Sequence, residues 1–415
     1  MPSPLISDSK GNISYDRNLK AAGMEGGSIF TLDGSDLVKL PAGSKLFMLP
    51  SRSAIGYDEA SGRLVTIKGS YAVAAFPAPG YTATYSAAYE PAGRPKQLPL
   101  FAYAAACFHK NEIYAAALRV DKDKRHDCRY IDMALVRKNI AKIAKLLPHN
   151  RLVGHLETCA MIHGCPNAQN FFLSRYEAPL PVSPSCNASC LGCISFQPGK
   201  RCPASQPRIR FVPRAEEAAE IALYHIENTA RPIVSFGQGC EGEPLLQNKL
   251  IAKAITLIRS KTQKGTVHMN TNGSRPEVLA RLIDAGLDSV RISLNSARES
   301  YYRKYYKPGG YAFGDVITSI KTAKKKGAFV SLNYLTMPGF TDTTDEFKAF
   351  RRLVSSCKVD MVQWRNLNYD PLKYFEELGA RPEPGDLLGV RNIIDSLHKE
   401  FPSLRMGYFN PFVGV

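Results

Sequence analysis

The chain has 415 residues, 44% of them hydrophobic, which predicts two or three folded units with ordinary apolar cores. No apolar run reaches the roughly 18 residues that span a bilayer, and the polar first residues lack the apolar segment of a secretory signal, so we expect a cytoplasmic protein. The formal net charge of +17 favours an anionic partner, such as nucleic acid, an acidic peptide or a phosphorylated small molecule. Solvated helix faces also account for this charge, because many basic residues lie in helical patterns.

Residues 1–178 predict an α+β domain. Short β-like segments separated by Gly and Pro, such as 45–50 and 64–68, open this region. Apolar residues at helical spacing then predict a helix over 133–147. The pattern does not specify a role, and we expect either substrate recognition or an auxiliary metal.

Residues 179–370 have a different pattern, in which short β-rich runs alternate with helical ones. The predicted strands are 180–182, 232–236, 266–270, 288–294, 329–335 and 360–365. The predicted helices between them are 215–227, 245–259, 275–285, 315–326 and 343–357. Such alternation predicts parallel strands with right-handed crossovers, and therefore an α/β fold with a partial (β/α)6 TIM-type barrel. Residues 371–415 are expected to pack on this barrel as a C-terminal extension, and function is expected at the carboxyl ends of the strands.

A cluster of cysteines follows the first predicted strand. Cys186, Cys190 and Cys193 have the spacing C-x3-C-x2-C. Closely spaced thiolates suit an iron–sulfur cluster or zinc. Three thiolates leave one iron of a [4Fe-4S] cluster open to a small molecule. The alternatives are a zinc site completed by Cys202 or Cys240, an electron-transfer cluster with four cysteines, and inert buried cysteines.

This motif and its position resemble the signature of the radical S-adenosylmethionine (SAM) superfamily. The resemblance implies a [4Fe-4S] cluster on the three cysteines, with SAM bound at the open iron. It also implies reductive cleavage of SAM to methionine and a 5′-deoxyadenosyl radical. The family usually has an aromatic residue just before the third cysteine, near the adenine. Gly192 stands there in this chain, so Phe196 is a candidate for that contact.

Two further segments resemble the same family. Gly242-Glu243-Pro244, after the second predicted strand, is similar to the family's Gly-Gly-Glu-Pro motif, which contacts the amino group of SAM. Glu241 replaces the first glycine of that motif, and a plain loop before a helix is the alternative interpretation. The family also has polar residues on the fourth strand for the ribose and carboxylate of SAM.

On the fourth predicted strand, polar residues repeat at period two, so they share one face. A parallel strand covered on both faces should be almost wholly apolar. The resemblance implies that Ser293 and Asn295 bind SAM, whereas hydrogen bonds among the side chains themselves are the alternative.

The remaining cysteines are less informative. Cys107, Cys128, Cys159 and Cys165 suit a second iron–sulfur cluster, a mononuclear iron or a zinc ion, but free cysteines are also common in cores. Their spacings match no known metal loop. The roles of three others stay open: Cys202, Cys240 and Cys357.

The sequence therefore predicts a radical SAM enzyme that acts on an unidentified peptide, protein or RNA substrate. Such an enzyme needs a reducing partner, for which a flavodoxin or ferredoxin type of donor is expected. An Asp-x-His-x-x-Gly motif is absent, which argues against cobalamin-dependent methyl transfer. The competing hypotheses are a non-enzymatic iron–sulfur or zinc protein that binds nucleic acid through its basic faces, and an enzyme-like scaffold that has lost its chemistry.

Overall fold

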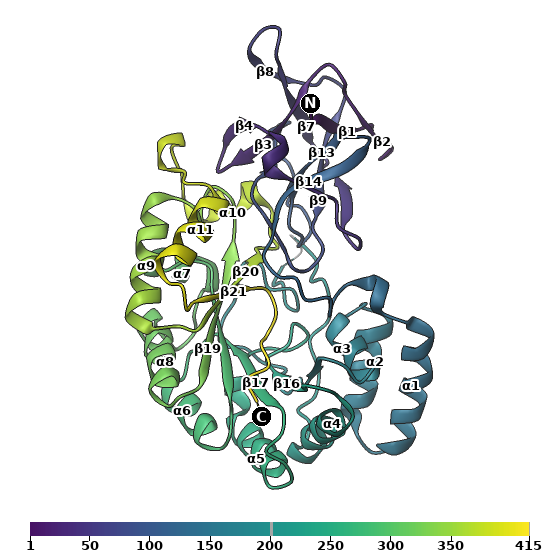
Figure 1. Ribbon diagram of the computed structural model, residues 1–415, viewed down its shortest axis with the longest axis vertical. Helices are drawn as coiled ribbons and strands as arrows, with labels where there is room; N and C mark the ends of the chain where they lie inside the picture. The colour runs from purple at the N-terminus through teal and green to yellow at the C-terminus, as the bar shows by residue number, and fades with distance from the viewer. Residues whose placement is uncertain (200–201, 415) are drawn as a thin grey trace.

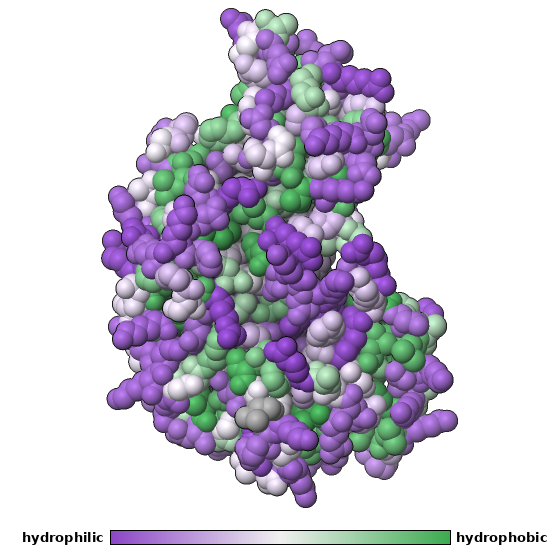
Figure 2. All heavy atoms as spheres, in the orientation of Figure 1, coloured by the Kyte–Doolittle hydropathy of each residue, from purple (hydrophilic) through white to green (hydrophobic). Residues whose placement is uncertain are grey.

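The computed structural model describes residues 1–199 and 202–414. An antiparallel sheet near the N-terminus lies at one end of the molecule, and a parallel sheet covered by helices forms the larger body (Figure 1). The surface is hollowed between the N-terminal sheet and the first three helices, and hydrophilic residues are spread widely over the face in view (Figure 2).

The N-terminal sheet contains 14 strands in the order β12-β7-β3-β11-β13-β1-β9-β6, with the others paired at its sides. Its strands are β1 Ser3–Ser7, β2 Ile13–Tyr15, β3 Lys20–Glu25, β4 Ser28–Thr31, β5 Leu37–Lys39, β6 Lys45–Met48, β7 Arg52–Asp58, β8 Arg63–Thr66, β9 Tyr71–Phe76, β10 Tyr81–Ala83, β11 Ser86–Ala87, β12 Tyr89–Pro91, β13 Ala104–His109 and β14 Glu112–Arg119. Buried alanines dominate β9, β13 and β14, which lets the faces of these strands pack closely.

Three helices lead from this sheet to the larger body: α1 Met133–Leu146, α2 Arg151–Met161 and α3 Pro166–Phe172. The Asp132 side chain accepts hydrogen bonds from the backbone of Ala134 and Leu135, which fixes the start of α1. Buried residues of these helices, such as Ile143 and Leu156, belong to the same apolar core as the parallel sheet. The predicted helix over 133–147 is thus confirmed.

The parallel sheet has seven strands in sequence order, from β15 to β21. They are β15 Glu177–Pro179, β16 Ile233–Phe236, β17 Thr266–Thr271, β18 Ser289–Leu294, β19 Phe329–Thr336, β20 Met361–Asn366 and β21 Arg405–Gly407. The accompanying helices are α4 Ala215–Asn228, α5 Asn248–Arg259, α6 Pro276–Asp284, α7 Glu299–Tyr306, α8 Phe313–Lys325, α9 Thr344–Cys357, α10 Pro371–Leu378 and α11 Val390–Glu400. This arrangement confirms the predicted partial barrel.

Two strands differ from the prediction. The first strand is Glu177–Pro179 rather than 180–182. The prediction was displaced because Glu177 is charged, and a charged residue is not expected in a buried strand. After the strand, the Leu180 backbone donates one further hydrogen bond, to the Ser235 carbonyl. The predicted six-stranded sheet gains a seventh strand, β21, whose three residues are too few and too polar to form a recognisable pattern.

The inner face of the sheet is polar, as the alternation along β18 predicts. The Arg291 guanidinium donates to Gln363 Oε1 over 2.9 Å, and Gln363 donates to Asn410 Oδ1 over 3.2 Å. Asn410 in turn donates to the Glu177 carboxylate over 2.8 Å. Asn410 belongs to the C-terminal tail, so this network connects the tail to β15, β18 and β20.

The N-terminal sheet docks on the carboxyl ends of β19 and β20. The Thr82 hydroxyl donates to the Trp364 carbonyl over 2.6 Å, and the Ala83 backbone donates to Asn366 Oδ1 over 2.8 Å. Arg52 and Asp370, both fully buried, form an ion pair of 2.6 Å across the same contact. Separately, none of the described helices is long and apolar enough to cross a membrane.

Candidate functional site

The loop that carries the three cysteines is held by the loop after β16. The Gly242 backbone donates to the Ser183 carbonyl over 2.7 Å, and the Glu243 backbone donates to the Ser185 carbonyl over 2.9 Å. A Cβ atom at position 242 would lie 1.9 Å from the Ser185 oxygen. Glycine is therefore required at Gly242, because only its backbone can approach the cysteine loop this closely.

The Glu243 side chain extends this contact to the third strand. Its carboxylate accepts hydrogen bonds from the Thr271 hydroxyl over 2.5 Å and from the Asn272 backbone over 2.8 Å. The Asn272 amide donates to Asn187 Oδ1, inside the cysteine loop, over 2.8 Å. Burial raises the pKa of Glu243 to about 7, although these hydrogen bonds oppose the shift. The loops after the first three strands are thus locked together.

The sequence departure at Glu241 has a structural explanation. The Glu241 carboxylate accepts four backbone hydrogen bonds, from Val182, Ser183, Gly237 and Gln238, over 2.6 to 3.0 Å. Two of these donors follow β15 and two follow β16. The carboxylate therefore fastens the two loops to each other, although burial raises its pKa to about 7.

The three cysteine thiols are half-buried. Burial, and then the neighbouring Glu243 carboxylate, raise the pKa of the Cys186 thiol to about 11. Burial also raises the pKa of Cys190. The Arg208 guanidinium lies 3.5 Å from the Cys193 sulfur and brings a positive charge to the loop. Binding of a metal would favour the thiolate form of these cysteines.

The arrangement of these thiols fits a multi-iron cluster better than a single ion. Within residues 1–199 and 202–414, the only group of three ligand atoms mutually within 4.8 Å excludes all three of these cysteines. In a [4Fe-4S] cluster each thiolate binds a different iron, so the sulfur atoms need not converge on one point. The zinc alternative with Cys240 as fourth ligand loses support, because the Cys240 sulfur lies 3.3 Å from His155 instead.

An aromatic side chain does lie beside Gly192. The Tyr305 hydroxyl, from α7, would be 2.7 Å from a Cβ atom at position 192, and Tyr305 is only 4% exposed. Phe196 is 48% exposed and contacts Arg208. The sequence pattern did not indicate Tyr305, because this residue is distant in the chain and lies in a helix that was not predicted. Its spacing with Tyr302 and Tyr306, which form one buried face of α7, was the available signal.

Ser293 and Asn295 lie at the carboxyl end of β18, where each forms a hydrogen bond with another side chain. The Ser293 hydroxyl accepts a hydrogen bond from Asn333 over 3.1 Å. The Asn295 amide donates to the Tyr374 hydroxyl over 3.2 Å, toward α10. The oxygens Asn295 Oδ1 and Asn333 Oδ1 are buried, and neither has a hydrogen-bond partner among the described residues. These orphaned acceptors fit a polar ligand such as SAM, which carries hydroxyl and ammonium donors.

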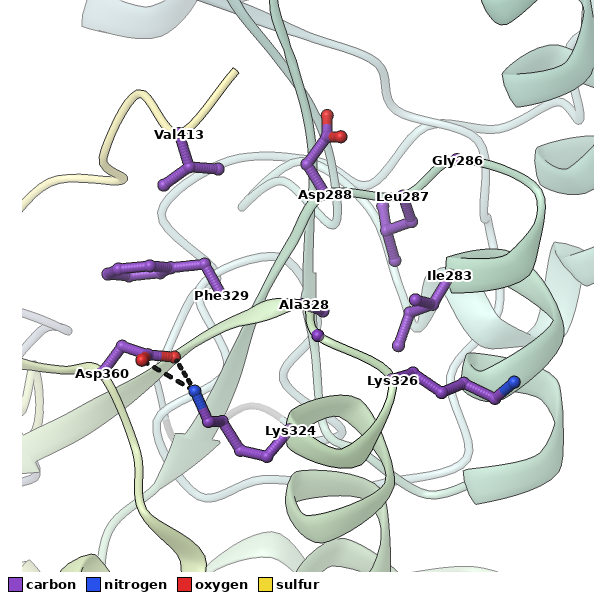
Figure 3. A pocket seen from close by; sticks show the side chains of 11 residues that line it. Ile283, Gly286, Leu287, Asp288, Lys324, Lys326, Ala328, Phe329, Asp360 and Val413 are labelled. Carbon is purple, nitrogen blue, oxygen red and sulfur yellow. Dashed lines mark hydrogen bonds and ion pairs between the residues drawn. The ribbon is translucent and has the colours of Figure 1, made fainter. Parts of the chain in front are cut away.

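A pocket of about 480 Å³ lies elsewhere, at the amino-terminal ends of β18, β19 and β20 (Figure 3). The carboxylates in this pocket already have hydrogen-bond partners in the sheet and its helices. Asp360 accepts from Lys324 and from the Val330 backbone, and Asp288 accepts from the Val267 backbone. Because the cysteine loop is at the opposite ends of the strands, this pocket is separate from the candidate site.

Comparisons with known proteins agree with this geometry. Residues 180–354 match the family model of the radical SAM superfamily. The FeMo cofactor biosynthesis protein NifB of Klebsiella pneumoniae is 23% identical over 179 residues, which cover 40% of this chain and 38% of NifB. The GTP 3′,8-cyclase of Heliobacterium modesticaldum is 31% identical over 176 residues, which cover 41% of this chain and 49% of the cyclase. The chain thus spans half or less of each of these two relatives.

Among solved structures, native anSMEcpe with bound AdoMet is similar at 16% identity and a TM-score of 0.41, covering 56% of this chain and 64% of that one. Members of the matched superfamily are enzymes that use a [4Fe-4S] cluster and SAM and generally need a reductant. Residues 180–354 of this chain are thus similar to the radical SAM superfamily.

Proposed function

We propose that the chain is a radical SAM enzyme that binds a [4Fe-4S] cluster through Cys186, Cys190 and Cys193. When bound, the cluster would supply one electron to SAM, yielding methionine and a 5′-deoxyadenosyl radical that removes a hydrogen atom from the substrate. The observation that carries this proposal is the backbone contact between the cysteine loop and Gly242-Glu243 at the carboxyl ends of the strands.

The residues around the cysteine loop would bind and orient SAM. Gly242 brings the backbone of its loop next to the cysteines, and the Glu243 carboxylate provides negative charge for an ammonium group. Ser293 and Asn295 would meet the ribose hydroxyls or the carboxylate of SAM. The orphaned oxygen of Asn333 lies on the neighbouring strand and is a further acceptor for those hydroxyls.

The N-terminal domain, residues 1–178, would cover the substrate side of the barrel. Its contacts through Thr82 and Ala83 lie at the carboxyl ends of β20, where a substrate must approach SAM. Such a cover excludes water and holds the reacting carbon in place. The substrate would be a peptide, a protein or RNA, with the net charge of +17 favouring an anionic one. The electron would come from a flavodoxin or ferredoxin type of donor.

The test is an assay for 5′-deoxyadenosine. The full chain is purified without oxygen, loaded with iron and sulfide, reduced, and incubated with SAM. We expect 5′-deoxyadenosine from the native chain and none from Cys190→Ala. The exposed Cys128 offers a matched control, since Cys128→Ala also removes one thiol but should keep the activity. A loaded, reduced cluster that yields no 5′-deoxyadenosine, even with cell extract as a substrate source, would favour the iron–sulfur binding hypothesis.

A further inference from the structure

A second group of metal-ligating side chains lies beside the candidate site. His155 and Cys159 are four residues apart in α2, so they share one face of the helix. Cys240 comes from the loop after β16. The His155 Nε2 atom is 3.3 Å from the Cys240 sulfur and 3.6 Å from the Cys159 sulfur. All three ligand atoms lie within 4.8 Å of one another.

This geometry matches a single tetrahedral ion. Zinc–sulfur bonds of about 2.3 Å and zinc–nitrogen bonds of about 2.0 Å place a sulfur and a nitrogen ligand about 3.5 Å apart. The two measured nitrogen–sulfur distances bracket that value. Cys159 is 2% exposed and Cys240 is 5% exposed, so the sulfur atoms are shielded from solvent as in structural zinc sites.

Ordinary core packing accounts for the positions of the other buried cysteines, but it accounts less well for the positions of Cys159 and Cys240. Cys107 lies in the apolar core of the N-terminal sheet, and Cys357 ends α9. In contrast, His155, Cys159 and Cys240 are the only described residues that gather in this way, although they come from two segments far apart in the chain. Two thiolates and an imidazole are a ligand set that zinc favours.

Cys165 is placed to complete the coordination. Its backbone N–H donates to the Cys159 carbonyl over 2.9 Å, which folds the chain back after α2. The backbone of Cys165 therefore lies next to that of the ligand Cys159. With the Cys165 thiol turned toward the other three ligands, the set would be Cys3His, which is one of the closed structural zinc sites.

We propose that His155, Cys159 and Cys240 bind one Zn²⁺ ion, with Cys165 as the fourth ligand. Binding releases the protons of the three thiols and involves no change of oxidation state. The ion joins α2 to the loop that contains Glu241, Gly242 and Glu243. Its role is therefore structural, because it holds the loop that contacts the cysteine loop against the helices outside the barrel.

The experiment must separate this site from the three-cysteine loop, because thiolates in general are zinc ligands. The full chain is therefore prepared with Cys186, Cys190 and Cys193 all changed to Ala, and its metals are quantified by mass spectrometry. We expect about one zinc per chain in this variant. Adding Cys240→Ala should reduce zinc to a trace, whereas adding Cys128→Ala should leave it unchanged.

A spectroscopic measurement avoids dependence on the Cys240→Ala variant folding well. Zinc is removed with a chelator from the triple variant, and Co²⁺ is added. We expect thiolate-to-cobalt charge-transfer bands and the visible bands of tetrahedral cobalt, saturating at one equivalent. Absence of these bands, a disulfide between Cys159 and Cys240, or stoichiometric iron instead of zinc would overturn the proposal. Loss of 5′-deoxyadenosine formation is not a readout here, so the two proposals fail independently.

Discussion

At the scale of single residues, Gly192 departs from the family pattern, and we propose that Tyr305 compensates for the missing aromatic residue. The space that an aromatic side chain would need at this position is occupied by Tyr305 from α7. No spacing within the cysteine motif could reveal this, because the compensation depends on a contact more than a hundred residues away. The three cysteines, Gly242 and Glu243 stay predicted site residues, chosen because their short-range pattern itself is typical of this chemistry.

The contact between Gly192 and Tyr305 can be tested sterically. In Gly192→Ala the new Cβ atom would lie 2.7 Å from the Tyr305 hydroxyl, so we expect about 1–3 kcal/mol of destabilisation and reduced iron incorporation. Tyr305→Phe removes the clashing oxygen, and the nearest remaining atom is then the Asn368 carbonyl oxygen at 3.3 Å. The double variant should therefore recover part of the lost stability and iron content, measured by thermal unfolding and iron analysis. If Tyr305→Phe gave no rescue, this contact would not explain the glycine.

At the scale of elements, most helices and strands of the barrel agree with the sequence pattern within a few residues. Apolar periodicity was sufficient for them because each has one face in the shared core. It failed for α7, whose buried face consists of Tyr302, Tyr305 and Tyr306. It also failed for the three-residue strands β15 and β21, where burial depends on the neighbouring strands rather than on local composition.

The connection between the loops after β15 and β16 depends on the Glu241 carboxylate. In Glu241→Ala four buried or half-buried backbone donors lose their acceptor, so we expect the free energy of unfolding to fall by about 3 kcal/mol. Glu241→Gln keeps an oxygen for one pair of donors and places an amide N–H₂ against the other. The free energy of unfolding of Glu241→Gln, measured by denaturant titration, should therefore lie between those of Glu241→Ala and the native chain. The exposed Glu157 offers a control, because Glu157→Ala should change stability little. Equal effects of Gln and Ala would contradict this account.

At the scale of the whole molecule, the N-terminal sheet and the barrel meet through buried polar groups. Besides the ion pair of Arg52 with Asp370, Glu25 at the end of β3 faces Asp342 in the loop after β19. Both carboxyl groups are buried, with exposures of 4% and 0%. Burial, and then the charge of Asp342, raise the pKa of Glu25, so we expect the two groups to share one proton. The sequence offered no sign of this contact, because its partners lie far apart in the chain.

This pair predicts how stability depends on pH. Glu25 keeps its proton in the folded chain above its ordinary pKa of 4.5, whereas the unfolded chain loses it. The unfolded state therefore binds fewer protons, and the unfolding free energy contributed by this group falls as pH rises above 4.5 until the raised pKa is reached. In Glu25→Gln an uncharged amide still donates to Asp342 but does not titrate. We expect this variant to be more stable than the native chain at pH 8, with little difference at pH 4.5.

Denaturant titrations of both chains between pH 4.5 and 8 would measure this difference. Glu59→Gln, at an exposed position of the same domain, controls for the loss of one carboxyl group and should keep the native pH dependence. If Glu25→Gln followed the native curve, the buried pair would not share a proton. If the prediction holds, docking of the N-terminal sheet on the barrel is tightest in mildly acidic solution, because the proton that joins Glu25 to Asp342 is retained there.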